Sequence, residues 1–291
     1  MNHPRLLKYA VICMSIFFYN AVYSWGLTGH RIVGGLAEKH LTDNTTLHVR
    51  HILDGYKLQD VSNWADEIKS DRSALSQSLS KWHYMEAADP AMIDSKPNDD
   101  WPMDIHHALV LIKKRLEHQR FEAPLTEPVL LRLLIHLVAD AHQPLHVGNG
   151  KDHGANACYV RWFSSKWTTR LHTIWDSKLI DAYLLSYTEY IDVLDHLNEK
   201  TIKQWQADSM STWLKESRAL HAEIYPIDKR INISDYCVPK RSQLKIDKVP
   251  KIGYDYQSRV RPILNQRLAQ AGIRLAGILN EIYDNRGKPE A

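Results

Sequence analysis

The sequence lacks an excess of charge of either sign. Its 291 residues include 37 lysines and arginines against 34 aspartates and glutamates. An N-terminal segment that we expect to be removed contains Arg5 and Lys8 but no acidic residue, so the remaining chain has 35 basic residues and the same 34 acidic ones. A generally basic surface for nucleic acid is therefore excluded, and any contact with phosphate must be local.

Cysteine is scarce as well. Cys13 lies in the N-terminal segment, so the remaining chain has two cysteines, Cys158 and Cys237, which could bond to each other. A disulfide fits a chain that enters an oxidising compartment, and two buried free thiols fit the sequence almost as well.

Only one long hydrophobic run marks the chain, and it lies at the N-terminus. Arg5 and Lys8 precede the apolar residues 9–22, and permitted residues precede a cleavage site at Val22 and Ser24. The run is shorter than the roughly 20 residues that span a bilayer. We therefore interpret residues 1–24 as a secretory signal peptide cut after Ser24, not as a membrane anchor. The mature protein would begin at Trp25 and be secreted or periplasmic, with no stable membrane anchor.

The sequence has no low-complexity linkers or repeats that would divide it, and its strand signal is weak. Residues 25–291 are therefore predicted to form a single domain of mainly α class. Hydrophobic periodicity and breakers predict these elements: a helix capped by Thr28 and reaching 41, a helix from Pro128 to 142, a helix over 171–185, one or two helices over 187–216, a helix over 259–283, a short strand over 157–163, and long loops over 89–104 and 225–256.

Polar residues interrupt the most apolar of these predicted helices. His136 and Asp140 are four residues apart and share one helical face, in a segment too apolar to leave them in water. His172 and Asp176 repeat this spacing on a second helix, and His146 follows the first. Imidazole and carboxylate are the ligands that zinc takes in catalytic sites. One such pair alone is more often a hydrogen-bonded His–Asp pair, but two pairs with a further histidine favour a metal site.

These residues lie in stretches that resemble a known family. HLVADAHQPLH, followed by HGAN, RWF and LHTIWD, resembles the signature of the zinc-dependent single-strand nucleases of the P-one/S-one type. The stretch WGLTGH matches that family's W-G-x-x-G-H. The resemblance covers nearly the whole mature chain. It implies one compact all-α domain, of a fold shared with bacterial zinc phospholipases C, with a cleft that holds three zinc ions.

The resemblance also implies nine metal ligands, one for each position of the family's site. They form three sets that share one aspartate: Asp66, His83, His136 and Asp140 for one zinc ion, Trp25, His30 and Asp140 for a second, and His146, His172 and Asp176 for the third.

Trp25 is an unusual ligand with a chemical reason of its own. In the family, the free amine and the carbonyl oxygen of the N-terminal tryptophan bind zinc. An α-amino group has an unperturbed pKa of about 8, well below that of lysine, so a metal can displace its proton near neutral pH. A peptide bond in front of Trp25 prevents this contact. We therefore expect signal removal to complete the site.

Further matches concern the phosphate group. By resemblance, Asp66 orients or deprotonates the attacking water, Lys69 stabilises the transition state, and Asn156 binds phosphate as in the family's G-G-N loop. The sequence departs from the family at Ala155, which stands at a glycine position. If that residue needs a positive φ, the loop has to be reshaped and phosphate binding weakens.

The implied function is a secreted zinc-dependent endonuclease acting as a monomer. It would hydrolyse single-stranded DNA and RNA to 5'-phosphorylated products, and removal of 3'-phosphate from nucleotides is compatible with it. A zinc-dependent phospholipase C on the same metal frame is the first alternative, which Asp176, in place of a glutamate, and the matches at Lys69 and Asn156 disfavour. A non-catalytic, zinc-stabilised binding protein is the second, and it leaves Asp66 and Lys69 without a role.

Overall fold

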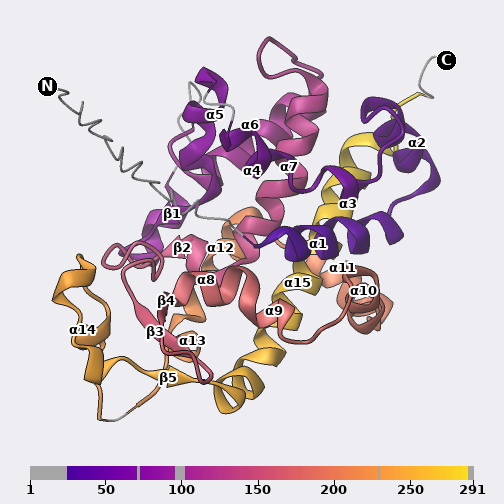
Figure 1. Ribbon diagram of the computed structural model, residues 1–291. Helices are drawn as coiled ribbons and strands as arrows, with labels where there is room; N and C mark the ends of the chain where they lie inside the picture. The colour runs from indigo at the N-terminus through magenta and orange to yellow at the C-terminus, as the bar shows by residue number, and fades with distance from the viewer. Residues whose placement is uncertain (1–24, 71–72, 96–101, 229, 288–291) are drawn as a thin grey trace, which may run out of the picture.

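The longest helix, α15 (Tyr254–Tyr283), runs along the molecule and is contacted by helices from most of the chain (Figure 1). The computed structural model describes residues 25–70, 73–95, 102–228 and 230–287. The predicted signal peptide and its cut after Ser24 lie outside the described residues. The prediction of a mainly α fold is confirmed.

Fifteen α-helices are formed by the described residues, together with short 3-10 turns and one π turn. The other α-helices are α1 (Leu27–Lys39), α2 (Asp43–Ile52), α3 (Leu58–Val61), α4 (Trp64–Glu67), α5 (Ala74–Leu79), α6 (Ile105–Glu117), α7 (Glu127–His142), α8 (Leu171–Thr173), α9 (Leu179–Asp181), α10 (Tyr187–Leu194), α11 (Glu199–Gln206), α12 (Met210–Ala219), α13 (His221–Ile224) and α14 (Ile233–Tyr236). The turns are η1 (Ile68–Ser70), η2 (Ser80–His83), η3 (Pro90–Asp94), η4 (Pro144–His146), η6 (Arg241–Gln243), η7 (Ile246–Lys248) and the π turn η5 (Ile174–Lys178).

Helices α1, α7 and α15 pack against one another and form the centre of the core. Helix α7 begins with Pro128 in its first turn, and its residues from Leu133 to His142 are all buried, as its nearly uniform apolar sequence predicts. Gly272 lets α15 approach α1 closely, because a Cβ there would lie 2.8 Å from the Leu36 side chain. The end of α7 is thereby enclosed on several sides.

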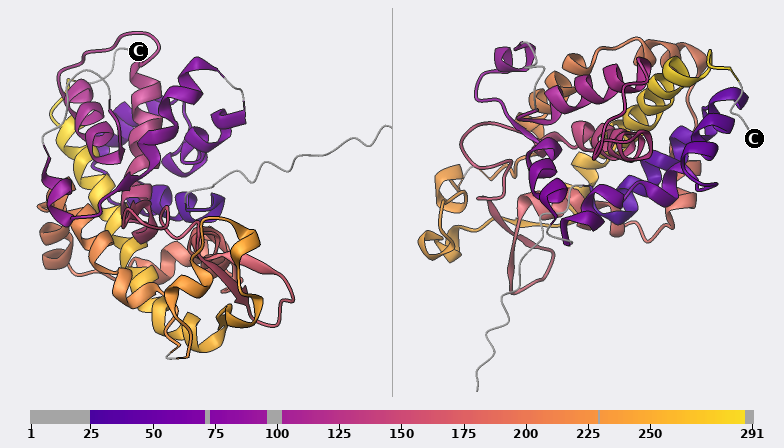
Figure 2. Two further views of the ribbon diagram at one scale, coloured as in Figure 1. Left: turned by 90° about the vertical axis from the view of Figure 1, so that its left-hand side faces the viewer. Right: turned by 90° about the horizontal axis from the view of Figure 1, so that it is seen from above.

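The strands are short, and those of the larger sheet lie near α14 at one side of the molecule (Figures 1 and 2). Strands β1 (Met85–Glu86) and β2 (Val147–Gly148) pair in parallel. Strand β3 (Tyr159–Trp162) lies between β4 (Thr168–Arg170), antiparallel to it, and β5 (Lys251–Ile252), parallel to it. The predicted strand over 157–163 is therefore confirmed.

The structure corrects the predicted start of the first helix. The helix begins at Leu27 with Gly26 as its N-cap, so Thr28 lies inside it. The Gly26 N–H donates to the backbone oxygen of Asp176 at 2.5 Å. A tertiary contact, which no local pattern encodes, sets the start of α1.

Two other predicted helices are divided differently. The stretch 171–185 forms α8, the π turn η5 and α9, and it ends at Asp181 because Leu184 takes a positive φ of 56°. The stretch 187–216 holds three helices instead of one or two, because Asn198 and Ser209 cap new helices through their side chains. The predicted loop over 225–256 also contains α14, η6, η7 and β5.

Cys158 and Cys237 form a disulfide, so the first of the two alternatives for this pair holds. The bond joins the start of β3 to the segment after α14, where the two residues also form a β-bridge. Among the helices of the described residues, none has the length and apolar character needed to cross a bilayer.

A buried charge network fixes α15 against α12 behind the end of α7. The guanidinium groups of Arg267 and Arg274 both donate to Glu216 Oε2 at 2.6 Å, and the two arginine side chains are 2% and 0% exposed. Arg274 also donates to Nε2 of His142 at 3.0 Å. His142 therefore contacts α15 through Nε2, while its Nδ1 donates to the carbonyl oxygen of Val138 in its own helix at 2.7 Å.

The substitution Glu216→Gln is expected to lower the free energy of unfolding by about 2–4 kcal/mol, because it leaves two buried guanidinium groups without their shared anion. Urea unfolding of the purified protein measures this. Glu199→Gln is the control, because Glu199 and its partner Lys203 are 90% and 79% exposed, and its cost is expected below about 0.5 kcal/mol. Equal unfolding midpoints for the two variants would contradict the structural role of the network.

Candidate metal centre

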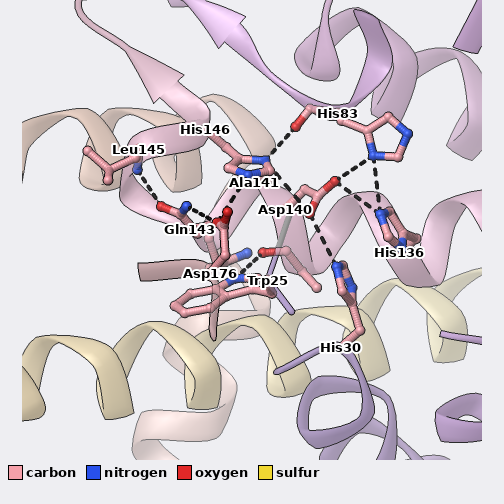
Figure 3. Close-up of polar contacts among 12 residues, drawn as sticks. Trp25, His30, His83, His136, Asp140, Ala141, Gln143, Leu145, His146 and Asp176 are labelled. Atoms are coloured by element: carbon pink, nitrogen blue, oxygen red, sulfur yellow. Dashed lines mark hydrogen bonds and ion pairs between the residues drawn. The ribbon is translucent and has the colours of Figure 1, made fainter. Parts of the chain in front are cut away.

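The carboxylate of Asp140 lies at the centre of a buried group of imidazoles (Figure 3). Its Oδ2 lies 2.9 Å from His83 Nδ1 and 3.3 Å from His136 Nε2. Its Oδ1 lies 3.5 Å from His30 Nε2 and 3.7 Å from His146 Nδ1. The two oxygens therefore face different histidines, as in a carboxylate that bridges two cations.

The first implied set comes from three separate elements. Asp66 is on α4, His83 ends η2, and His136 is on α7. His136 Nε2 lies 3.2 Å from His83 Nδ1 and 3.7 Å from Asp66 Oδ1. The ring of His30, from α1, stacks on that of His136 with centroids 3.8 Å apart. The first and second implied sets are thus contiguous.

The third implied set lies on the other side of Asp140. His146 Nε2 and His172 Nε2 lie 3.9 Å and 3.4 Å from the two carboxylate oxygens of Asp176. The rings of His146 and His172 stack with centroids 5.1 Å apart. Asp176 sits in the π turn η5, where the extra residue of the turn breaks the regular helical spacing.

Backbone carbonyls orient three of these imidazoles. The Nδ1 atoms of His136, His146 and His172 donate to the carbonyl oxygens of Ser62, His83 and Gly154 at 2.8, 2.7 and 2.6 Å. A carbonyl oxygen only accepts hydrogen bonds, so each Nδ1 carries a proton and each Nε2 is turned toward the cluster.

The buried donor atoms fit metal ions. Nε2 of His146, Nε2 of His172 and Oδ1 of Asp140 have no hydrogen-bond partner among the described residues. Burying such atoms without partners is costly, and a zinc ion with nitrogen and oxygen ligands removes that cost. The residues present therefore fit zinc.

Burial and neighbouring charge control the protonation of the cluster. Burial lowers the pKa of His83 to about 4 and that of His172 to about 3. Burial raises the pKa of Asp66, but the positive charges of His136 and Lys69 outweigh it and hold that pKa at about 2. These groups are thus in the neutral imidazole and anionic carboxylate forms that bind metals near neutral pH.

Asp176 behaves in the opposite way, because burial raises the pKa of its carboxyl well above the usual value. The side-chain amide of Gln143 donates to Asp176 Oδ1 at 2.7 Å and lowers this pKa in part. A cation beside Asp176 would stabilise its charged form. Gln143 is fully buried and was not predicted, although a glutamine between the site histidines His136 and His146 is the signal that could have revealed it.

Trp25 lies beside this cluster with its indole fully buried. Its Nε1 donates to the carbonyl oxygen of Ala139 at 2.7 Å. The next residue, Gly26, is bonded to the backbone of Asp176. The side chain thus anchors the backbone of residue 25 between α7 and η5, next to two of the implied ligands.

A pocket of about 710 Å³ opens onto the cluster. Lys69 and Asn156 line it together with His83, His146 and His172. Lys69 Nζ donates to Asp66 Oδ1 at 2.5 Å, so the ammonium lies where the cluster meets the pocket. The pocket therefore connects the cluster to the surface of the protein.

The loop before Asn156 has a left-handed backbone. Gly154 has a φ of 58° and Ala155 a φ of 60°, so the alanine adopts the positive φ that the sequence departure put in question. This conformation costs roughly 1–2 kcal/mol for a residue with a Cβ. Gly154 is under a stricter constraint, because a Cβ there would lie 2.2 Å from the oxygen of Leu145.

The chain is similar in sequence to known proteins over nearly its whole length. Residues 25–284 match the sequence model of the S1/P1 nuclease family. Endonuclease 5 and endonuclease 4 of Arabidopsis thaliana are each 30% identical, the first over 98% of both chains and the second over 92% of both. Nuclease S1 of Aspergillus oryzae is 25% identical over 96% of this chain and 98% of its own.

Gly154→Ala is expected to lower the free energy of unfolding by about 2–4 kcal/mol, because the strain of a positive φ adds to a clash with Leu145. It should also displace the carbonyl that orients His172 and reduce the bound zinc, measured by atomic emission. Gly55→Ala is the matched control, since Gly55 has a φ of 85° and nothing within 4 Å of an added Cβ. If both variants lose the same stability, backbone strain alone explains the loss at Gly154, and the proposed clash with Leu145 is contradicted.

Proposed function

The chain belongs to the S1/P1 nuclease family, and from that membership we propose the metal ions, residues and substrates through which it acts. It is a single-strand-specific endonuclease, a hydrolase of phosphodiester bonds. The observation that carries the proposal is the carboxylate of Asp140, whose two oxygens face separate groups of imidazoles.

Zinc is the metal of this family, and the proposed site takes three ions. The first is held by Asp66, His83, His136 and Asp140, the second by Trp25, His30 and Asp140, and the third by His146, His172 and Asp176. Three groups of side chains each have their ligand atoms within 4.8 Å of one another: His30, Asp66 and His136; His83, His136 and Asp140; and His146, His172 and Asp176. The last group is the third proposed set, the second is part of the first set, and the first joins His30 of the second set to two residues of the first. When bound, zinc supplies Lewis acidity toward phosphate oxygens and lowers the pKa of water.

The chain's own groups then position the reactants. Asp66 is ionised and accepts from Lys69, so its other oxygen can orient the attacking water or take its proton. The ammonium of Lys69 faces the pocket and stabilises charge on the phosphate oxygens as it develops. Asn156 binds the phosphate through its side-chain amide, which now donates to the His153 carbonyl oxygen at 3.0 Å.

The pocket favours single strands of DNA and RNA over duplexes. A base must leave its stack to bring its phosphate to a recessed cluster, and a flexible strand allows this at low cost. Tyr84 and Tyr159 line the pocket, and Tyr84 is 46% exposed, so aromatic faces are offered to the bases. The products carry 5'-phosphates, and nucleotides with a 3'-phosphate are further substrates.

The proposed mature protein is a secreted or periplasmic monomer with one domain over 25–291, made by removal of residues 1–24. The match of the family from residue 25 supports this boundary. The amine and carbonyl oxygen of Trp25 chelate zinc only after the cut. The buried indole, bonded to Ala139, holds that backbone in position.

Asp66→Asn is expected to reduce cleavage of single-stranded DNA and RNA by about 100-fold or more, because it removes the proposed base. The assay uses mature protein with and without chelator, and phosphatidylcholine serves as a further substrate. Asp192→Asn is the control. Asp192 is 76% exposed, it pairs with Lys39 of α1, and it does not line the pocket. Lipid cleavage together with inert nucleic acid would contradict the nuclease proposal.

One extra residue left before Trp25 should remove about one zinc ion per chain and most of the activity, because an amide nitrogen cannot replace the amine as a ligand. Zinc content and cleavage of single-stranded DNA are measured on the same preparations. Full zinc content and activity in the extended protein would exclude the amine as a ligand, while leaving the other two zinc sets untouched.

A further inference from the structure

Arg170 is a charged residue of the pocket that the reaction described above does not use. It ends β4, serves as the N-cap of α8 and lines the pocket together with Lys69, Asn156 and His172. Its side chain is half-buried. Among the described residues, no hydrogen bond or ion pair involves its guanidinium group. Its five N–H donors therefore have no anionic partner among the described residues of the pocket that Arg170 lines.

The other charged groups on this pocket wall are already engaged. Lys69 pairs with Asp66 at 2.5 Å, and Glu86 accepts from the backbone N–H of Gly150 at 2.8 Å. By contrast, the buried guanidinium groups of α15 are held by Glu216. An arginine on a pocket wall without an anion of its own indicates that its anion arrives with the substrate.

The backbone of Arg170 is firmly held. Arg170 is paired with Tyr159 across the antiparallel β3–β4 ladder, and both residues line the pocket on the same face. The Leu171 N–H donates to the carbonyl oxygen of Cys158 at 2.8 Å, and Cys158 is fixed in turn by its disulfide with Cys237. The backbone that carries the guanidinium is therefore already ordered, so that binding costs only the freedom of the side chain.

Arg170 and Lys69 lie beside different implied metal sets of the same pocket. Lys69 Nζ lies 2.5 Å from Asp66 Oδ1, which belongs to the first set. Arg170 precedes His172 of the third set by two residues, and both residues line the pocket. Two cationic groups at two sets suit two successive phosphates of a strand, one at Lys69 and the next at Arg170.

We propose that Arg170 binds the phosphate that flanks the scissile one, and that it makes the enzyme prefer strands with consecutive phosphates to substrates with one phosphate. The chemistry is a bidentate pair between a planar guanidinium and two phosphate oxygens. This inference rests on the proposed nuclease function. It names a specificity residue for that function and assigns Arg170 no part in the bond-breaking step.

The test compares the dinucleoside monophosphate dTpdT with the trinucleotide dTpdTpdT, which has a flanking phosphate whichever bond is cut. In Arg170→Gln, kcat/KM for the trinucleotide is expected to fall about 10- to 100-fold through KM, since hydrogen bonds to a charged group are lost. The value for dTpdT should change less than about threefold. Arg170→Lys should recover only part of the loss, because lysine keeps the positive charge but lacks the planar guanidinium that can bind two phosphate oxygens at once.

Lys166→Gln is the matched control, because Lys166 is an exposed cation in the turn between β3 and β4. It should leave the ratio of the two kcat/KM values unchanged. That ratio is internal to each preparation, so a partly unfolded variant does not alter it. Equal loss on both substrates, or no loss on either, would overturn the proposal. A wild-type protein that cleaves neither substrate nor longer single strands would instead contradict the nuclease function.

A second measurement removes the charge from the substrate. Trinucleotides with one neutral methylphosphonate linkage, at the first or the second position, leave a single cleavable bond with an uncharged flank. In the wild-type protein, the neutral linkage at one of the two positions should lower kcat/KM. The fall should be about as large as the one that Arg170→Gln causes on the fully charged trinucleotide. Arg170→Gln should be indifferent to the neutral linkage at both positions. A further loss of similar size in the variant would mean that another group binds the flanking phosphate.

Discussion

The contact on which the account depends is the buried carboxylate of Asp140 between two groups of imidazoles. A buried carboxylate is costly unless it is hydrogen-bonded or paired with a cation, and here His83 and His136 face one oxygen while His30 faces the other. Burial raises the pKa of Asp140, yet its histidine neighbours hold it well below the usual value. A charged centre of this kind is maintained for metal ions more readily than for stability alone.

The rest of the fold holds this centre rigid. Helix α7 presents Asp140 and His136 from its buried end, and α1 and α15 close around it. The network of Arg267, Arg274 and Glu216 fixes α15 behind it. Backbone carbonyls set the orientation of His136, His146 and His172, so that the Nε2 atoms of these imidazoles are turned toward the cluster. Stability and function thus depend on the same few contacts.

The sequence predicted the parts of the site that follow from helical geometry. Residues four apart lie on one helical face, so the pair His136 and Asp140 was visible as two polar residues in an apolar helix. Asp66 and His83 lie on short elements without periodicity, and only the family resemblance pointed to them. The family and the mainly α class were predicted correctly, and the ligand roles remain predictions.

The parts that were not predicted depend on tertiary contacts. Gln143 matters through a bond to a residue 33 positions away, and α1 starts at Leu27 because Gly26 is bonded to the backbone of Asp176. Arg170 reaches the pocket because a hairpin pairs it with Tyr159. No local pattern encodes such contacts. Ala155 was noted as a departure, but only the backbone angle showed that it adopts a positive φ.

The most direct test of the bridging role of Asp140 is anomalous X-ray diffraction at the zinc edge from crystals of the mature protein. Three peaks are expected, two of them on either side of the Asp140 carboxylate and the third beside His146, His172 and Asp176. A single peak near Asp140, or none, would contradict the claim that this carboxylate joins two metal ions.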